Sequence, residues 1–489
     1  MDFPLLTAIV FLPLAGVLVC ALLPKTRTQA ARGIALGITL LDLALAAWMV
    51  VAFDTEGGMQ FVEQVKWVPQ LGIQYHLGVD GVSVSMVFLS ALLSTLAVVA
   101  SWDIDLTPRT YFALLLLLEV GMNGVFLALD FVLFYVFWEL VLVPMYFLIG
   151  TWGGPRREHA ALKFFLYTLF GSVFMLVGII ALYLSPAGGT FDITALVDAG
   201  LPASFQWWVF AAFFLGFAVK VPIFPLHTWL PDAHVEAPTA ASVLLAGILL
   251  KMGTYGFIRV ALPILPDAAR AWSPIIATLA VISIVYGAAV AFAQKDLKKL
   301  VAYSSISHMG FVMLGIASGT PEGLAGAVAV MFSHGVVTGM LFFLVGMVYE
   351  RTHTRMIDEV SGLSAQVPVA GGLLAFASFA SLGLPGLSGF VGEFLSLLGA
   401  WKSDIPSGLV VVAAIGVLLA AAYMLFMVQR VVLGTPSSAV VDLKDLTARE
   451  IAVLVPLVAL TLVVGLWWDS LLRFVDPAVA RIVAVLVGA

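Results

Sequence analysis

The chain has 489 residues, of which 62% are hydrophobic and only 11% are charged, and its formal net charge is −6. Soluble proteins are about one-quarter charged, so this composition excludes a soluble enzyme and predicts one membrane domain over residues 1–489. The single cysteine, Cys20, excludes an intramolecular disulfide and a cysteine-ligated metal or iron–sulfur site. The sequence contains no phosphate loop and no basic surface pattern, so neither a nucleotide nor nucleic acid is an expected partner.

Apolar segments long enough to cross a bilayer, each needing about 20 residues, follow one another along the whole chain. They cover residues 3–23, 33–53, 82–101, 111–129, 131–150, 162–184, 207–226, 239–261, 273–293, 300–318, 325–347, 368–401, 408–432 and 450–468. We therefore expect an all-α polytopic membrane protein with 14 transmembrane helices. Residues 471–489 mix charged and apolar side chains and are expected to form an interfacial helix at the C-terminus.

Two of these segments contain a predicted break. In the seventh, Lys220 is followed by Pro222, Pro225 and Pro231, and each proline removes a backbone donor and ends or bends a helix. The twelfth is too long for one straight span, and SLGLPGLSGF (residues 381–390) interrupts it. Broken helices at membrane depth occur where the freed backbone lines a cavity or is covered by protein.

The two breaks occupy matching places in two blocks of five segments. The first block covers about 111–261 (spans 4–8) and the second about 273–432 (spans 9–13), and the broken helix is the fourth member of each. Because five is an odd number, the second block is inverted relative to the first. Inverted repeats with discontinuous helices are typical of secondary transporters, and we expect two inverted five-helix repeats here.

Positive charge is distributed unevenly between the loops. Of the 23 lysine and arginine residues, 15 lie in loops after odd-numbered segments and 4 in loops after even-numbered segments. Cytoplasmic loops of membrane proteins carry the excess of positive charge. We therefore expect the odd-numbered loops in the cytoplasm and both chain termini outside.

Charged residues lie in the middle of several apolar segments. Lys220, Lys251, Glu139 and Glu119 each have apolar sequence on both sides. A charge at the bilayer centre costs about 2.5–3.5 kcal/mol on insertion scales, so such residues usually pair or line an ion path. We expect Glu139 to pair with Lys220. The alternatives are a lysine that snorkels from a helix end and a neutral buried carboxyl that is satisfied by the backbone.

Histidines and acids also surround the first break. His227 and His234 lie in PLHTWLPDAHVEAPT together with Asp232 and Glu236. This pattern predicts a hydrogen-bond network at the helix end in preference to a metal site. His227 is in addition a possible proton relay.

Three further ionisable residues lie in the second block. His308 and His334 stand beside serine and glycine, and each is either a satisfied core residue or part of a proton relay. Glu393 follows the second break and is the counterpart of Lys220, with a helix cap as the alternative. We expect a polar row at the membrane midplane, with Glu119 as a further possible relay; its members are Glu139, Lys220, Lys251, His308, His334 and Glu393.

Four stretches resemble the antiporter-like subunits of respiratory complex I, the proton-pumping NADH:quinone oxidoreductase. They are FWELVLVPMYFLIGTWGG (137–154), KVPIFPLHTWLPDAHVEAPTAASVLLAGILLKMGTYG (220–256), KKLVAYSSISHMG (298–310) and LPGLSGFVGEF (384–394). The resemblance extends over nearly the whole chain. It implies 14 helices in two inverted repeats and proton-translocation roles for Glu139, Lys220, Lys251 and Glu393.

Two features favour the branch of that family called subunit M, the counterpart of mitochondrial subunit 4. The distal ionisable residue is Glu393, where two sister branches have lysine, and a long lateral helix does not follow the last segment. The resemblance implies a bacterial plasma (inner) membrane and other membrane-arm subunits as partners, especially two sister antiporter-like subunits on either side. It also places FMN, iron–sulfur clusters, NADH and the quinone site in partner subunits, with no cofactor in this chain.

The expected function is therefore proton translocation, coupled to electron transfer from NADH to quinone in other subunits. A subunit of a multi-subunit sodium/proton antiporter is the first alternative, and a membrane-bound hydrogenase subunit is the second. Both are relatives of this family, and the antiporter subunit would share the Glu139–Lys220 pair, so the pair does not discriminate against it. A passive structural membrane subunit, whose charges only position helices, is the third.

Overall fold

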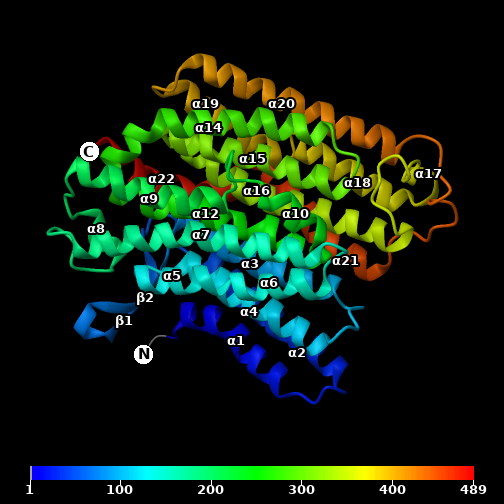
Figure 1. The fold of residues 1–489 in the computed structure, drawn as a ribbon, viewed down its shortest axis with the longest axis horizontal. Coiled ribbons are helices and arrows are strands. Elements are labelled where there is room, and N and C mark those ends of the chain that lie inside the picture. The colour runs from blue at the N-terminus through cyan, green and yellow to red at the C-terminus, as the bar shows by residue number, and fades with distance from the viewer. Residues whose placement is uncertain (1–2, 489) are drawn as a thin grey trace.

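The computed structural model describes residues 3–488 and shows an elongated bundle whose helices run mostly along one direction or its reverse (Figure 1). Within these residues, thirteen helices or helical runs are long and apolar enough to cross a membrane. In chain order they are α1 (Leu5–Leu22), α2 (Thr28–Ala52), α3 (Gly81–Ala100), α4 (Pro108–Leu127), α5 with α6 (Phe131–Leu140, Leu142–Trp152), α7 (Arg157–Leu184), α9 (Ala203–Lys220), α11 to α13 (Thr239–Leu244, η2 Leu245–Leu249, α12 Leu250–Gly256, η3 Phe257–Ala261, α13 Leu262–Ile264), α14 (Pro266–Phe292), α15 (Leu297–Ser318), α16 (Pro321–Thr352), α20 with η4 (Ser407–Met427, Val428–Val432) and α21 (Ala448–Leu466).

The connections gather at two opposite ends of the bundle (Figure 1). The odd-loop end contains the loops after odd-numbered spans, including residues 101–107, 153–156, 237–238, 353–367 and 433–447. The even-loop end contains the others, including residues 53–80, 185–202 and 403–406.

The predicted twelfth span is not one helix. It consists of α18 (Pro368–Ser381) and α19 (Ser388–Lys402), which are joined by a non-helical link, and α17 (Leu363–Gln366) precedes them. Each of the two is too short to cross a hydrocarbon core of about 30 Å alone. This is why the structure has thirteen long spans where the sequence predicts 14. The link lies inside the predicted break at residues 381–390.

The seventh span is also broken where the sequence predicts it. α9 ends at Lys220 and a short helix, α10 (Trp229–Glu236), continues after the prolines. Neighbouring side chains satisfy backbone groups that the break leaves without helical partners. The indole nitrogen of Trp229 donates to the Val219 carbonyl at 2.9 Å, and the Phe224 amide donates to Ser283 Oγ at 3.0 Å. The protein around the break therefore satisfies these backbone groups, as a helix break inside a membrane bundle requires.

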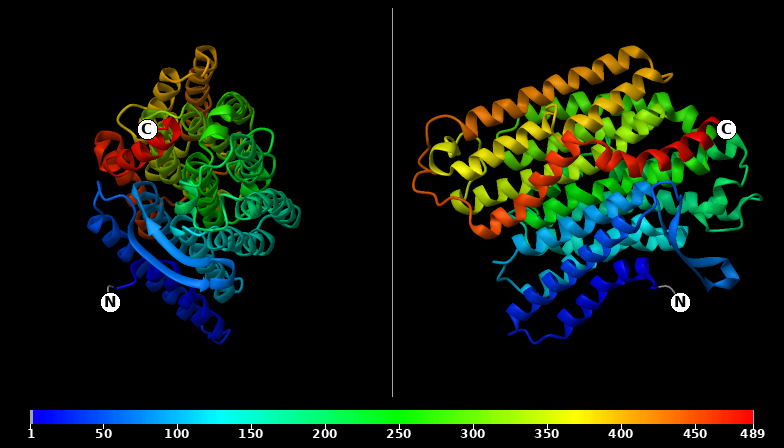
Figure 2. Two further views of the ribbon diagram at one scale, coloured as in Figure 1. Left: turned by 90° about the vertical axis from the view of Figure 1, so that its left-hand side faces the viewer. Right: turned by 180° about the vertical axis from the view of Figure 1, so that it is seen from behind.

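A two-stranded antiparallel hairpin departs from the all-α expectation. It consists of β1 (Gln60–Val68) and β2 (Ile73–Val79), joined by the 3₁₀ turn η1 (Pro69–Leu71), and it connects α2 with α3. The hairpin lies at the even-loop end, which faces the viewer in the left panel of Figure 2. Most side chains of β1 remain exposed, so the strand lacks the apolar face by which a half-buried strand is recognised in sequence.

The last helix, α22 (Asp469–Val487), packs on the even-loop end. Its buried side chains recur with helical spacing, as Leu471, Phe474, Ala478 and Ile482 show. They contact the helices α3 and α16. The predicted interfacial segment 471–489 thus forms an amphipathic helix whose apolar face is covered by protein, and its final residue lies outside the described residues.

Candidate functional site

Lys251 is fully buried in α12, between the two π-helical turns η2 and η3. Its ammonium group donates to the carbonyl of Ala246 in η2 at 2.5 Å. The same nitrogen lies 2.6 Å from Nδ1 of His334 in α16. π-helical turns are frequent at functional sites, and here one of them supplies a carbonyl acceptor for a buried ammonium group.

The contacts continue from His334 to Glu393. The rings of His334 and His308 lie 5.7 Å apart, centroid to centroid. Nδ1 of His308 lies 2.8 Å from Oε1 of Glu393, and Nε2 lies 3.2 Å from the hydroxyl of Ser381. A cavity of about 20 Å³ touches both histidines and Glu393, which is enough room for one water molecule. Lys251, His334, His308 and Glu393 thus form a nearly continuous polar row.

The backbone of the second helix break lies directly against the Glu393 carboxyl group. Gly383 in the link has φ +79°, and a Cβ added there would lie 2.9 Å from Oε2 of Glu393. Any other residue would combine an unfavourable backbone conformation with this close approach. The glycine therefore lets the backbone of the break approach the acid at the end of the row.

Glu139 and Lys220 are charged neighbours that do not touch. Lys220 is the last residue of α9 and is 1% exposed, and its ammonium group lies 5.4 Å from the ring centroid of Trp138. Among the described residues, neither Lys220 Nζ nor Glu139 Oε1 has a hydrogen-bond partner. The expected Glu139–Lys220 pair is therefore not formed as a direct hydrogen bond in the described structure.

Close packing joins the helices that carry the two lysines. A Cβ added at Gly253 would lie 2.8 Å from the Phe217 carbonyl. α12 therefore contacts α9 closely, one turn from both Lys251 and Lys220. Within the described chain no hydrogen bond links the two ammonium groups, because Lys220 Nζ has no partner.

The remaining predicted relay residues lie apart from the row. His227 packs against Phe224 and Tyr286, with ring centroids 5.7 and 5.1 Å away. Glu119 lies in α4, which packs against α2, the helix of Asp42, and both acids are fully buried. Neither carboxyl oxygen of Glu119 has a hydrogen-bond partner among the described residues, so the structure does not join Glu119 to the row.

Two acids at the first break, Glu236 and Asp232, form the hydrogen bonds that the sequence predicts there. The Arg156 amide donates to Oε2 of Glu236 at 2.9 Å, and the Lys163 ammonium group donates to Asp232 at 2.7 Å. His234 does not join this network. Its ring stacks on Phe342 with centroids 4.6 Å apart.

Three buried polar residues of the bundle interior are not predicted from the sequence. Ser381 contacts His308, and Tyr423 of α20 is a fully buried phenol. Lys298, which appears in the sequence as one of two lysines at a helix start, is only 6% exposed and donates to the Ala237 carbonyl at 2.5 Å. The position of Ser381 at the start of the break was the one signal that pointed to it.

Comparisons with known proteins agree with this architecture. The family described as NADH:quinone oxidoreductase/Mrp antiporter, TM, matches residues 128–420. NADH-quinone oxidoreductase subunit M of Rhodobacter capsulatus is 43% identical over 498 residues, which cover 98% of this chain and 96% of that protein. These matches extend over both broken helices and all residues of the row.

Solved structures show the same fold. A chain of respiratory complex I from Thermus thermophilus with bound NADH has a TM-score of 0.90 at 34% identity, over 98% of this chain and 99% of that one. A chain of the Mrp complex from Dietzia sp. DQ12-45-1b has a TM-score of 0.85 at 25% identity, over 99% of this chain and 52% of that one. The resemblance to subunit M is confirmed, and the chain belongs to the NADH:quinone oxidoreductase/Mrp antiporter family of membrane subunits.

Proposed function

We propose that this chain is a proton-translocating membrane-arm subunit of an NADH:quinone oxidoreductase. The observation that carries the proposal is the row Lys251, His334, His308 and Glu393, in which buried ionisable groups of four helices contact one another. Ionisable residues inside a membrane usually mark ion pathways and proton relays. The relationship to subunit M of Rhodobacter capsulatus supports the assignment of the coupled reaction.

Each contact in the row can pass a proton between the two groups that form it. The Lys251 ammonium group gives a proton to Nδ1 of His334 and becomes an amine. The His334 ring releases a proton from Nε2 to His308 through the space for one water between them. His308 then gives its Nδ1 proton to the Glu393 carboxylate, which becomes the acid. Histidine suits the middle positions because it can bind and release a proton near neutral pH.

Glu139 and Lys220 lie outside the row, in the first block of helices. The interaction energy of such a pair is comparable to the energy needed to move a proton across the membrane potential. Two unit charges 4 Å apart interact with about 4 kcal/mol at an effective dielectric constant of 20. Moving one charge across 100 mV requires about 2.3 kcal/mol. A change in the Glu139–Lys220 separation can therefore decide whether Lys220 holds or releases a proton against a membrane potential. The absence of a direct bond between them, within residues 3–488, leaves that separation free to change.

The two broken helices determine the membrane topology that we propose for the chain. We place 14 membrane crossings in the chain, counting α18 with α19 as one discontinuous helix. Two inverted repeats then cover about 111–261 and 273–432, with a broken helix in matching places. The odd-loop end faces the cytoplasm of a bacterial plasma membrane, and both termini lie outside.

The redox chemistry lies in other subunits of the assembly. We assign NADH, FMN, the iron–sulfur clusters and the quinone site to partner subunits, and two sister antiporter-like subunits to the flanks of this chain. The apolar outer surface supports a position in the membrane arm, since exposed side chains such as Leu166, Phe170 and Leu418 face outward from the bundle.

Replacing Lys251 with alanine in the assembled complex tests the function. We expect normal assembly and a more than tenfold loss of NADH-driven proton pumping. A matched control is Lys402→Ala, which removes a half-exposed lysine paired with Glu322 at the even-loop end. Normal pumping in Lys251→Ala would overturn the proposal. Loss of sodium tolerance with unchanged NADH oxidation would instead favour a sodium/proton antiporter, the function suggested by the likeness to the Mrp complex.

A further inference from the structure

Two acids lie in the bundle core at a distance from the row. Asp42 belongs to α2 and Glu119 to α4, and both side chains are fully buried. α1 packs against both of these helices, so the acids lie in a core that α1, α2 and α4 form together. In Figure 1 these three helices lie below α12, α15, α16 and α19, which carry the row.

Asn123 of α4 connects the three helices. Its Nδ2 donates to Oδ2 of Asp42 at 3.0 Å and to the Ile9 carbonyl of α1 at 3.3 Å. In an unbroken helix the amide four residues later would donate to that carbonyl, but this position is Pro13, which has no amide hydrogen. Both hydrogens of the Asn123 amide are therefore used, and both go to acceptors.

This core holds more hydrogen-bond acceptors than donors. Glu119 precedes Asn123 by one helical turn, so the two side chains share one face of α4. Among the residues that the structure describes, no partner contacts Oε1 or Oε2 of Glu119, Oδ1 of Asp42 or Oδ1 of Asn123. Each of these buried oxygen atoms costs free energy until a donor satisfies it.

The two acids also lack a compensating positive charge. Within residues 3–488 neither forms a salt bridge, since the partner of Asp42 is an amide and Glu119 has none. An ionised carboxyl that is buried without a partner is so costly that it takes up a proton instead. Two ionised carboxyls in one apolar core would in addition repel each other. The core is therefore neutral when each acid carries one proton.

A proton on each acid also supplies the donors that the core lacks. A carboxylic acid and a primary amide can pair reciprocally, each through one donor and one acceptor. Asn123 already donates to Oδ2 of Asp42, so a proton on Oδ1 of Asp42 can be donated in return to Oδ1 of Asn123. A proton on Glu119 gives that side chain a donor as well. The same two protons thus remove the negative charge and satisfy acceptors.

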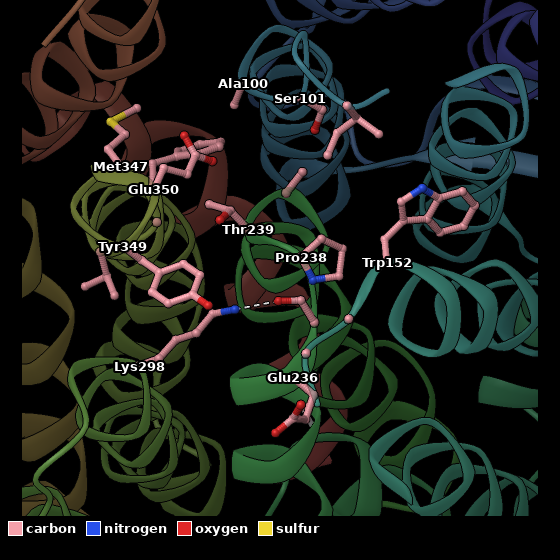
Figure 3. A pocket seen from close by; sticks show the side chains of 18 of the residues that line it. Ala100, Ser101, Trp152, Glu236, Pro238, Thr239, Lys298, Met347, Tyr349 and Glu350 are labelled. Carbon is pink, nitrogen blue, oxygen red and sulfur yellow. Dashed lines mark hydrogen bonds between the residues drawn. The ribbon is translucent and has the colours of Figure 1, made fainter. Parts of the chain in front are cut away.

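The surface is distant from these acids along α4. A cavity of about 290 Å³ lies at the odd-loop end, and Ser101 is part of its wall (Figure 3). The Ser101 hydroxyl lies 3.0 Å from that of Tyr111, which also lines the cavity. Tyr111 precedes Glu119 by about two turns of α4, roughly 12 Å along the helix axis. Exchange of protons between water and the two acids is therefore slow and requires the packing around α4 to open.

We propose that Asp42, Glu119 and Asn123 form a second proton-binding site, separate from the row, in which each carboxyl holds one proton at neutral pH. Each carboxylate takes its proton from a hydronium ion, so that one O–H bond forms as another breaks and a water molecule is released. Asn123 positions Asp42 and links the site to the bend of α1 at Pro13. The site is independent of the proposed translocation route, because neither acid contacts the row.

Infrared spectroscopy of the assembled complex tests the site, because the C=O stretch of a protonated carboxyl is separate from the bands of a carboxylate. At pH 7 we expect Asp42→Asn and Glu119→Gln each to lose the band intensity of one protonated carboxyl. The control is Glu158→Gln, at an exposed acid in the first turn of α7, which should lose none. An unchanged acid band in either buried variant would show that the replaced acid is ionised and would overturn the site.

Sodium distinguishes a bound proton from a bound metal cation. Added sodium chloride at constant pH should leave the acid band of the native complex unchanged. A decrease that Glu119→Gln abolishes would overturn the proposal in favour of a sodium ion.

Assembly and pumping test whether the site is separate from the row. Both neutral variants should assemble and pump at close to the native rate, because an amide has the shape of the protonated acid. Failure of both to assemble would overturn the site, and a tenfold loss of pumping would overturn its separation from the translocation route. Lys251→Ala, which tests the proposed function, should leave the acid bands of Asp42 and Glu119 in place.

Discussion

His308 and Glu393 meet across the second helix break, with Nδ1 and Oε1 2.8 Å apart although 85 residues separate them in the sequence. Both side chains are almost completely buried, at 5% and 4% exposure. A buried carboxyl group is costly unless it is hydrogen-bonded. The histidine supplies that hydrogen bond, and in the proposed route it also delivers a proton to the acid. This contact is the last one in the row that begins at Lys251.

Replacing Glu393 with glutamine separates these two roles. The amide keeps the size of the side chain and a hydrogen-bond partner for His308, but it cannot accept a proton. We expect normal assembly and a more than tenfold loss of NADH-driven proton pumping, whereas Glu393→Asp should retain part of the activity. Pumping is measured as acidification inside inverted membrane vesicles. Full pumping by the glutamine variant would remove Glu393 from the route.

Glu139→Ala removes the carboxyl that we propose as the partner of Lys220. Because no hydrogen bond joins the two groups in the described structure, the alanine variant should assemble normally. It should lose both NADH:quinone turnover and proton pumping. The control is Glu158→Ala, an exposed acid in the first turn of α7. Normal turnover and pumping in Glu139→Ala would show that this acid is outside the coupling machinery and would favour a purely structural role.

Gly383→Ala should destabilise the second break. Position 383 has φ +79° and an added Cβ meets Glu393 Oε2 at 2.9 Å, and a non-glycine residue in such a conformation costs about 1–3 kcal/mol. We expect a lower melting temperature of the purified complex and reduced pumping. The control is Gly372→Ala within α18, where, in the described structure, an added Cβ meets nothing within 4 Å. That change should be neutral or slightly stabilising, and equal losses in both variants would contradict this account of Gly383.

The spans and the two breaks could be predicted because their signals are local. A window of apolar residues indicates a membrane helix whatever packs against it. Prolines after Lys220 and the LPG sequence of residues 384–386 end a helix by their own geometry. The count differed at one place, since the twelfth segment divides into two helices that are each too short to count as a span.

Contacts between helices that are far apart in the chain could not be predicted from the sequence, because no local pattern indicates them. The sequence contains nothing that distinguishes Lys298 from its neighbour Lys299, yet only Lys298 is buried, under the Ala237 carbonyl. Glu119 was expected only as a further possible relay because of its depth in the span, and the packing of α4 on α2 places it on the side of the bundle away from the row. Depth in a span is a one-dimensional property, whereas the row depends on which face each helix turns inward.

Asp192 joins the hairpin to the loop before α8 (Ile193–Val197), because its carboxyl contacts His76 of β2. It accepts from the backbone and hydroxyl of Thr194 at 2.9 and 2.6 Å, and its other oxygen lies 3.2 Å from Nδ1 of His76 in β2. Burial raises the pKa of Asp192, but the hydrogen bonds from His76 and Thr194 lower it by more than burial raises it. The net effect lowers the pKa from its ordinary 3.8 to about 2. A folded-state pKa below the unfolded value stabilises the structure above the unfolded pKa. This contribution, roughly 2 kcal/mol at 1.36 kcal/mol per unit, is therefore present at pH 7 and is lost as the pH falls from about 4 to about 2.

We expect Asp192→Asn to increase hydrogen exchange of the amides in β2 at pH 7, because the neutral amide cannot replace the charged acceptor. At about pH 2 and below, the variant and the native chain should approach the same protection, since the native carboxyl, with a pKa of about 2, becomes protonated there. The comparison is made between the two proteins at each pH, so that the intrinsic pH dependence of exchange cancels. The control is Asp198→Asn, at an exposed position at the other end of α8 (Ile193–Val197). Equal protection of β2 in Asp192→Asn and the native chain at pH 7 would show that contacts such as the Leu77–Ala128 bridge hold the hairpin without Asp192.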